Sequence, residues 1–351
     1  MARDVAIVAT AQRPSEAATN LTAVEMILPV VQDVLASAGV ERRDIGFWCH
    51  GSCDYMVGQP FSFVAAVDAL GAFPPIVESH VEADGAFALY EAWVKIQTGE
   101  CDTALVFSNG KSSAGPIADI MTFQLDPYLE APLRPSMHVL AGLQARAGLD
   151  AGAFDERAMA EVAARSRRDA IANPVALVRG DHSVDDLLAA PTTYAPLREH
   201  DCPPVTDGAN AVILAAGDVA RSWCDRPAWI RGIDHRIDTQ RLGARSLAES
   251  RSTAEAGRRA GVGADKVDLA ELHAPYSHQE LVLRTALGLD GATVVNPSGG
   301  ALCANPQMAA GLARFIEAAN RVTAGSADRA VAHATSGPCL QQNLVAVLEG
   351  E

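Results

Sequence analysis

The sequence predicts an α/β protein in which one βαβ layout occurs twice. Short apolar runs alternate with stretches of helical spacing, a pattern typical of parallel strands joined by crossover helices. Residues 38–48 resemble residues 260–270 at an offset of 222 (260 minus 38). Residues 99–105 resemble residues 325–331 at an offset of 226 (325 minus 99). The constant order and near-constant offset favour duplication over chance similarity.

The first copy contains three short apolar runs typical of strands and two stretches with helical spacing. In chain order we expect a strand over residues 5–9, a helix over 22–35, a strand over 45–48, a helix over 85–96 and a strand over 104–107. Thr22 followed by Glu25 indicates a capping box at the start of the first helix. Pro29 lies inside the same helical pattern and can kink or split it.

Between the two copies the pattern changes and prolines become frequent. A basic amphipathic helix is predicted over residues 158–172, with Arg165, Arg167 and Arg168. We interpret this region as an inserted loop domain, and a solvated helical connector is the alternative. The predicted division is 1–120 with 197–220 for the first half, 121–196 for the insertion, and 221–351 for the second half.

The composition excludes several classes of partner. The chain has 351 residues, 49% of them hydrophobic, and a net charge of −15. This charge disfavours nucleic acid and anionic membrane surfaces. No apolar run reaches the roughly 20 residues of a transmembrane helix, and the start lacks the apolar core of a signal peptide. Seven scattered cysteines indicate reduced thiols, so we expect a cytoplasmic protein without a metal site.

Five segments, in a specific order over nearly the whole chain, resemble thiolases of the sterol-carrier-protein type. They are residues 82–89, 206–211, 271–276, 296–300 and 337–343. The resemblance implies the thiolase fold: two βαβαβαββ halves in five α-β-α-β-α layers, with an inserted loop domain. Residues 47–49, 78–82 and 332–350 resemble the actinobacterial lipid-transfer-protein homologues of sterol side-chain breakdown.

The departures from this family concern its catalytic residues. Thiolases place a cysteine at a helix N-terminus, where the helix dipole favours the thiolate; the matching position here is Glu82. Asn305 before Pro306 replaces the histidine of the Gly-His-Pro motif, and an amide cannot take up and release a proton at neutral pH. Cys339 is near the second cysteine position but follows Gly337 and a proline. Acyl transfer by this chain alone is therefore disfavoured.

The resemblance also covers aldol-type lyases, in which two tyrosines form the catalytic pair; here the pair at those positions would be His273 and Asn305. A retro-aldol reaction needs a base for the β-hydroxyl proton and hydrogen-bond donors for the thioester enolate. His273 is the first candidate for acid/base catalysis and Glu82 the second, while Tyr276 could donate to an oxyanion. The expected substrate-binding residues are Asn296, Gly299, Gly300, Cys303 and Gly337.

Structural roles are the alternative at each of these positions. His273 would be a core histidine, and Asn305 would only close a turn. Glu82 would belong to a wet strand face with Glu78, His80 and Asp84, because the four alternate with period 2. Residues 296–300 would shape a backbone turn, and Cys303 would be a buried thiol.

Two other motifs fail. Residues 110–113 resemble the end of a phosphate-binding loop but lack its first glycine. Cys49, His50 and Cys53 have no second ligand pair for a metal.

The resulting prediction is a thiolase-like subunit of a lyase that cleaves a β-hydroxyacyl-CoA, with a sterol side chain as the favoured substrate. Acyl transfer through Cys303 or Cys339 and a non-catalytic subunit that completes a partner's site are the alternatives. No cofactor is expected beyond the coenzyme A of the substrate, whose phosphate Arg165, Arg167 and Arg168 could contact. The resemblance implies two partners, a second thiolase-like chain and an OB-fold protein with a zinc ribbon.

Overall fold

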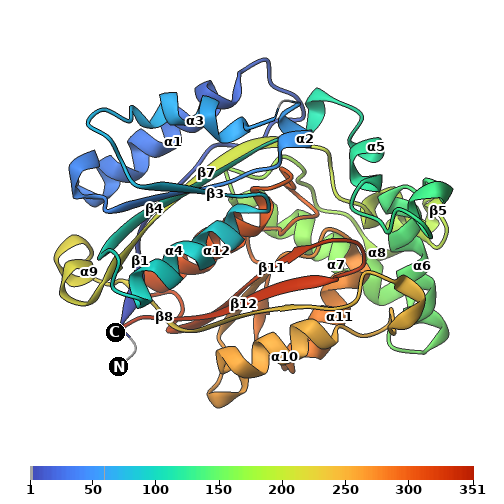
Figure 1. The fold of residues 1–351 in the computed structure, drawn as a ribbon. Helices are drawn as coiled ribbons and strands as arrows, with labels where there is room; N and C mark the ends of the chain where they lie inside the picture. Colours follow the sequence, from blue (N-terminus) through green and yellow to red (C-terminus); the bar gives the residue numbers. More distant parts are fainter. Residues whose placement is uncertain (1–2, 59) are drawn as a thin grey trace.

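The computed structural model describes residues 3–58 and 60–351 (Figure 1). Both halves contain five strands among these residues, in the same spatial order: β3-β2-β4-β7-β1 and β10-β9-β11-β12-β8. The first five are β1 (Val5–Gln12), β2 (Phe47–Gly51), β3 (Glu78–Val81), β4 (Thr103–Lys111) and β7 (Asp207–Ala216). The second five are β8 (Ala228–Ile237), β9 (Leu269–Leu272), β10 (Val294–Val295), β11 (Arg329–Ser336) and β12 (Gln342–Glu349). The predicted duplication is confirmed at the level of strand order.

Helices cover both faces of each half-sheet (Figure 1). Helices α4 (Gly85–Gln97) and α12 (Ala310–Thr323) pack between the two half-sheets, in one core with residues of β4 and β11. Helices α1 (Ala23–Ala38) and α3 (Ser62–Leu70) cover the outer face of the first half, and α10 (Arg251–Ala260) and α11 (Ser277–Leu287) that of the second. Over the described residues these are the five layers of the thiolase fold.

Local sequence signals account for the first helix. The Thr22 hydroxyl accepts from the Glu25 backbone N–H, and the Glu25 carboxylate accepts from the Thr22 N–H, so the predicted capping box is present. Helix α1 continues through Pro29 without a break. In β1, alternate residues face different cores: Ile7 packs toward the central helices and Ala6 toward the outer ones. Strands buried on both faces read as continuous apolar runs, which explains the sequence pattern.

The connection from β4 to β7 runs over residues 112–206, and so extends beyond the predicted 121–196 at both ends. It contains α5 (Ile117–Thr122), α6 (Met137–Asp150), α7 (Glu156–Asp169), α8 (Val184–Ala189), β5 (Thr192–Tyr194) and β6 (Leu197–Arg198). Two further short helices are α2 (Asp54–Val57) and α9 (Gly217–Trp223). Short 3-10 turns cover Arg42–Asp44, Ser112–Ala114, Ala131–Leu133, Ala170–Ala172, Glu199–Asp201, Leu242–Ala244 and Val262–Ala264. Helix α7 packs on α11, which joins the insertion to the second half.

Within the described part of the chain, no helix has the length and apolar character needed to span a bilayer. The same residues contain no group of three or more His, Cys, Asp or Glu side chains suited to a metal ion. The seven cysteines, all of them described, are free thiols.

Candidate active site

A narrow pocket of about 60 Å³ lies where the insertion meets the second half. Its lining residues are Ser112, Ile117, Ala118, Ser136, Met137, His138, Pro203, Pro204, Val205, Tyr276, Asn305 and Gln307. Ser112 follows β4 of the first half, and Tyr276 caps α11 of the second. Two of the four predicted catalytic residues, Tyr276 and Asn305, therefore reach one cavity.

His273 is hydrogen-bonded to Asn305 at the end of β9. Its Nε2 lies 3.2 Å from the Asn305 Oδ1, and the backbone N–H of Thr335 donates to its Nδ1 at 3.4 Å. Because Nδ1 accepts, the ring proton is on Nε2 and is donated to Asn305. The Asn305 oxygen is thus occupied, which leaves its amide nitrogen as the donor available to the pocket. No described residue accepts from this nitrogen.

Burial keeps His273 neutral. The residue is 7% exposed, and burial lowers the pKa of its imidazole to about 4. Both ring nitrogens have partners, and His273 is not among the residues that line the pocket. This arrangement orients Asn305 and polarises its amide, while an acid/base role for His273 stays a prediction.

Tyr276 and His138 form a second polar pair in the pocket. The Tyr276 hydroxyl lies 3.1 Å from the His138 Nδ1. Burial raises the pKa of Tyr276 and lowers that of His138, so both groups are neutral at pH 7. The His138 ring stacks on Tyr194, with centroids 4.7 Å apart. A neutral imidazole beside a phenol can take the phenol proton when the phenol oxygen removes one from a substrate.

Sequence reasoning missed His138. It is a single histidine near the start of α6, and no spacing connects it with Tyr276, which lies 138 residues further along the chain. Only the packing of the insertion against α11 brings the two together.

Glu82 lies away from this pocket. Its side chain is 47% exposed, its carboxylate accepts from the Asp54 backbone N–H at 2.8 Å, and it is not among the lining residues. The alternative of one wet strand face also fails, because Asp84 is buried. The Asp84 carboxylate caps α4 and accepts the backbone N–H groups of Gly311 and Leu312 at 2.8 and 2.9 Å. The sequence position of the thiolase cysteine thus holds a half-exposed carboxylate.

The glycine-rich turn over residues 296–300 supports the strand that carries His273. The Asn296 Oδ1 accepts from the Leu272 N–H at 2.6 Å, and its Nδ2 donates to Glu280 at 2.8 Å. Gly299 has a φ of +92°, and a Cβ there would lie 2.6 Å from the Cβ of Ala170. These contacts describe a backbone turn. Neither Asn296 nor Gly299 nor Gly300 lines the pocket, and their predicted substrate contacts stay predictions.

No thiol lines the pocket among the described residues. Cys303 is fully buried with Ala170, and burial raises the pKa of its thiol to about 12. Cys339 is also buried; its Sγ donates to the Leu140 carbonyl at 3.4 Å, and its pKa is raised to about 11. Gly337, with a φ of +72°, packs against a glutamine side chain. Neither sulfur is activated as a thiolate nucleophile needs to be.

Gln144 connects the walls of the pocket. Its Oε1 accepts from Gln279 at 2.9 Å and lies 3.2 Å from the His278 ring. Its Nε2 donates to the Cys339 carbonyl at 3.4 Å. Gln279 in turn accepts the backbone N–H of Tyr276 at 3.3 Å. This network fixes Tyr276 relative to α6, which carries His138.

No family model matches the chain. Acetyl-CoA acetyltransferase of Methanothermobacter thermautotrophicus is 26% identical over 90% of both chains. Sterol carrier protein 2 of Gallus gallus is 24% identical over 86% of this chain, which spans 63% of that protein. Among solved structures, an Ltp2-ChsH2(DUF35) aldolase superposes with a TM-score of 0.83 at 16% identity, covering 99% of this chain and 97% of that one. Human mitochondrial 3-ketoacyl-CoA thiolase superposes with a TM-score of 0.77 at 16% identity, with 99% of both chains covered.

The chain therefore has the thiolase fold, and the proteins that it resembles in sequence include members of the thiolase superfamily. Its relatives include thiolases of the sterol carrier protein 2 type, as the sequence motifs predicted.

Proposed function

We propose that this chain is the thiolase-like subunit of a carbon–carbon lyase that cleaves a β-hydroxyacyl-CoA by a retro-aldol reaction. One observation carries the proposal. The Asn305 amide donor and the hydrogen-bonded Tyr276–His138 pair line the same pocket, and the described residues that line it include no thiol. These groups suit proton transfer and oxyanion binding, and none suits formation of an acyl-enzyme.

In the proposed reaction the Tyr276 oxygen removes the proton of the β-hydroxyl while His138 takes the phenol proton. The Cα–Cβ bond breaks, a carbonyl forms at Cβ, and the bonding electrons move into the thioester as an enolate. The Asn305 amide N–H donates to the enolate oxygen, and His273 holds that amide in place. Return of the proton to Cα gives a ketone or aldehyde and a shorter acyl-CoA, without any co-reactant.

The relatives support an acyl-CoA thioester as the substrate. Two of them are named acetyl-CoA acetyltransferases, one is named a benzoylsuccinyl-CoA thiolase subunit, and one structural neighbour is named an aldolase. Relatives named sterol carrier protein 2 support a sterol side chain as the acyl group. The free thiols of all seven described cysteines support a reducing compartment such as the cytoplasm.

The test is product analysis after incubation with a β-hydroxyacyl-CoA. We expect a ketone or aldehyde plus a shorter acyl-CoA, in equal amounts and without added free CoA. Product formation only from a β-ketoacyl-CoA, and only with free CoA, would identify acyl transfer instead. Cleavage that survives replacement of Tyr276 and Asn305 would assign the chemistry to a partner and this chain to a non-catalytic role.

We further propose that the chain works in a hetero-oligomer with a second thiolase-like subunit and an OB-fold zinc-ribbon protein. Strand β3 ends the described sheet and bonds only to β2, so its outer edge offers unpaired backbone groups. Exposed aromatic side chains lie on nearby segments, with Phe73 89% exposed and Tyr55 66% exposed. The name of the Ltp2-ChsH2(DUF35) neighbour joins two proteins and supports such an assembly.

A further inference from the structure

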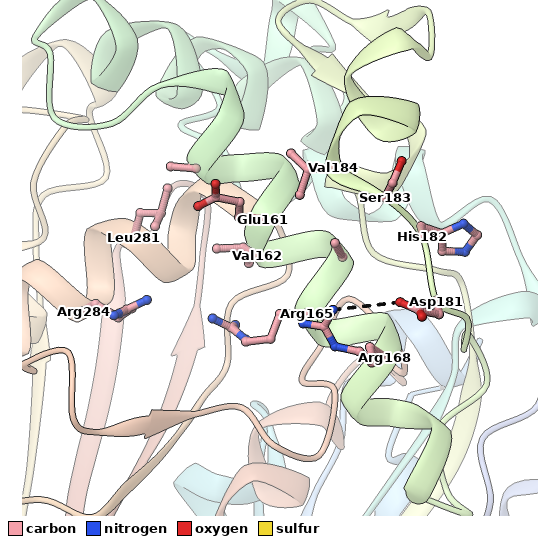
Figure 2. A pocket seen from close by; sticks show the side chains of 12 residues that line it. Glu161, Val162, Arg165, Arg168, Asp181, His182, Ser183, Val184, Leu281 and Arg284 are labelled. Carbon is pink, nitrogen blue, oxygen red and sulfur yellow. Dashed lines mark ion pairs between the residues drawn. The ribbon is translucent and has the colours of Figure 1, made fainter.

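Two cavities of the protein differ in the groups that can stabilise negative charge. The larger one, of about 610 Å³, lies between α7, α11 and the segment before α8, and three arginines line it: Arg165, Arg168 and Arg284 (Figure 2). Among the described residues that line the candidate active site, none is an Asp, Glu, Lys or Arg. An enolate oxygen in that site therefore depends on neutral hydrogen-bond donors.

Ser112 brings a buried hydroxyl to the wall of the candidate active site. The residue is 3% exposed and begins the 3-10 turn that follows β4. Its Oγ accepts the backbone N–H of Gln307 at 3.0 Å. A serine hydroxyl also has one proton to donate, and no described residue accepts it. Because a buried donor without an acceptor costs free energy, a substrate oxygen that accepts this proton would bind favourably.

Neighbouring contacts fix the turn before any ligand arrives. The Ser113 hydroxyl and backbone N–H donate to the Asp207 carboxylate at 2.6 and 2.9 Å, and Asp207 is 1% exposed. Asp207 also pairs with Lys111 in the ladder between β4 and β7. On the other side, the Gln307 N–H holds the oxygen of Ser112. The hydroxyl thus has a set position, as a preorganised oxyanion site requires.

The other neutral donors around the site are less suited to this task. Gln307 and Ser136 are partly exposed, and the side chain of Gln307 makes no hydrogen bond to a described residue. Tyr276 and His138 are bonded to one another and transfer the proton in the proposed reaction. Ser112 is the buried and fixed hydroxyl that this reaction leaves unused.

We propose that Ser112 donates a hydrogen bond to the thioester oxygen of the substrate, alongside the Asn305 amide. The inference deepens the proposed lyase function and rests on it for the reaction in which the donor acts. Asn305 lies two residues before Gln307, whose N–H binds the Ser112 oxygen, so one segment connects the two donors. Two fixed donors on one oxygen stabilise the charge that develops there as the Cα–Cβ bond breaks.

Steady-state kinetics test the donor in the reaction. Ser112→Ala should lower kcat for a β-hydroxyacyl-CoA about 100-fold and leave KM within about threefold, because the contact strengthens in the transition state. Ser113→Ala is the matched control, since its hydroxyl proton is already given to Asp207, which keeps the Ser113 backbone N–H. Its kcat should stay near that of the wild type. If the wild type cleaves the substrate, an unchanged kcat in Ser112→Ala overturns the proposal.

A pair of ligands tests the contact itself, whether or not the chain is a lyase. Isothermal titration calorimetry of the full chain compares acetyl-CoA with S-ethyl-CoA, in which a methylene group replaces the carbonyl. Ser112→Ala should weaken binding of acetyl-CoA about threefold or more relative to S-ethyl-CoA, because only acetyl-CoA has an oxygen there to accept the hydroxyl proton. Ser113→Ala should leave this ratio of affinities unchanged.

The two measurements separate this proposal from the lyase function. A lower ratio in Ser112→Ala, with no cleavage by the wild type, would retain Ser112 as a thioester-binding residue and reject the lyase. An unchanged ratio overturns the proposal even if kcat falls, since the fall would then reflect a loosened backbone at Gln307. A Kd of the wild type for acetyl-CoA above about 1 mM overturns it too, because no thioester oxygen would then reach the hydroxyl.

Discussion

At the scale of single residues, burial sets the protonation states around the pocket. His273 and His138 are neutral because desolvation disfavours the imidazolium, and Tyr276 keeps its proton for the same reason. The hydrogen bond from Thr335 then selects the tautomer of His273 that donates to Asn305. Because these side chains are all neutral, proton transfer in the site can begin without first neutralising a charged group.

The hydroxyl of Tyr276 is the first residue-scale test. Tyr276→Phe should lower turnover of a β-hydroxyacyl-CoA about 100-fold or more, because the group proposed to remove the substrate proton is gone. The phenyl ring keeps its packing beside Met159 and Leu197, so the thermal midpoint should change little. Tyr194→Phe is the matched control, since its ring still stacks on His138. Similar losses in both variants would argue against the assigned role.

The sequence could predict some of these residues and not others. Asn305, Tyr276 and His273 were predicted because they stand at motif positions of a family. His138 was not, because its partner lies across a tertiary contact that no local pattern records. Glu82 was predicted from its motif position alone, and its half-exposed side chain shows that a motif position does not determine a contact with the pocket.

At the scale of secondary structure elements, the end of β4 shapes the segment that presents Asn305. A Cβ on Gly110 would lie 2.0 Å from the Gln307 carbonyl oxygen and 2.8 Å from the Pro306 carbonyl carbon. Only a glycine allows this strand end to pass so close to the backbone that follows Asn305.

Gly110→Ala should therefore displace that segment. We expect the free energy of unfolding to fall by about 1–3 kcal/mol, as for other overpacked sites. Turnover should fall as well, by up to about 100-fold, because small displacements of a catalytic group are costly. Urea unfolding and steady-state kinetics measure the two effects. Gly115→Ala is the control, since its added Cβ would lie 3.9 Å from the nearest heavy atom. Equal losses of stability and turnover in the two variants would contradict this role of Gly110.

Element order was more predictable than element boundaries. The repeat predicted that β2 corresponds to β9 and that β4 corresponds to β11, because duplicated strands keep the same apolar runs. The connection between β4 and β7 starts at residue 112, before the predicted insertion at 121, and its first residues form a 3-10 turn and the start of α5. Turns of this kind follow from tertiary packing and leave little trace in hydrophobic spacing.

At the scale of the whole molecule, neutral buried histidines make stability depend on pH. Burial lowers the pKa of His278 to about 3, whereas an unfolded histidine titrates near 6.5. Between these values the unfolded chain binds more protons, so the free energy of unfolding falls as the pH falls from 6.5 toward 3. For His278 the loss between pH 7 and pH 5 is about 2 kcal/mol.

His278→Gln should remove that part of the pH dependence, because glutamine can still donate to Gln144. Urea unfolding at pH 7 and at pH 5 measures, for each protein, how far the free energy of unfolding falls on acidification. His182→Gln, at an exposed position, should keep the wild-type dependence. If His278→Gln loses as much stability on acidification as the wild type, burial of this imidazole is not the cause.

We propose that this thiolase fold cleaves carbon–carbon bonds by proton transfer, without a covalent acyl-enzyme. Intact-protein mass spectrometry after rapid acid quench of the chain with acetyl-CoA or a β-ketoacyl-CoA tests it most directly. We predict the unmodified mass, because Cys303 and Cys339 are buried with raised pKa values and neither lines the pocket. An acyl adduct on either cysteine, formed at a rate that matches turnover, would contradict it.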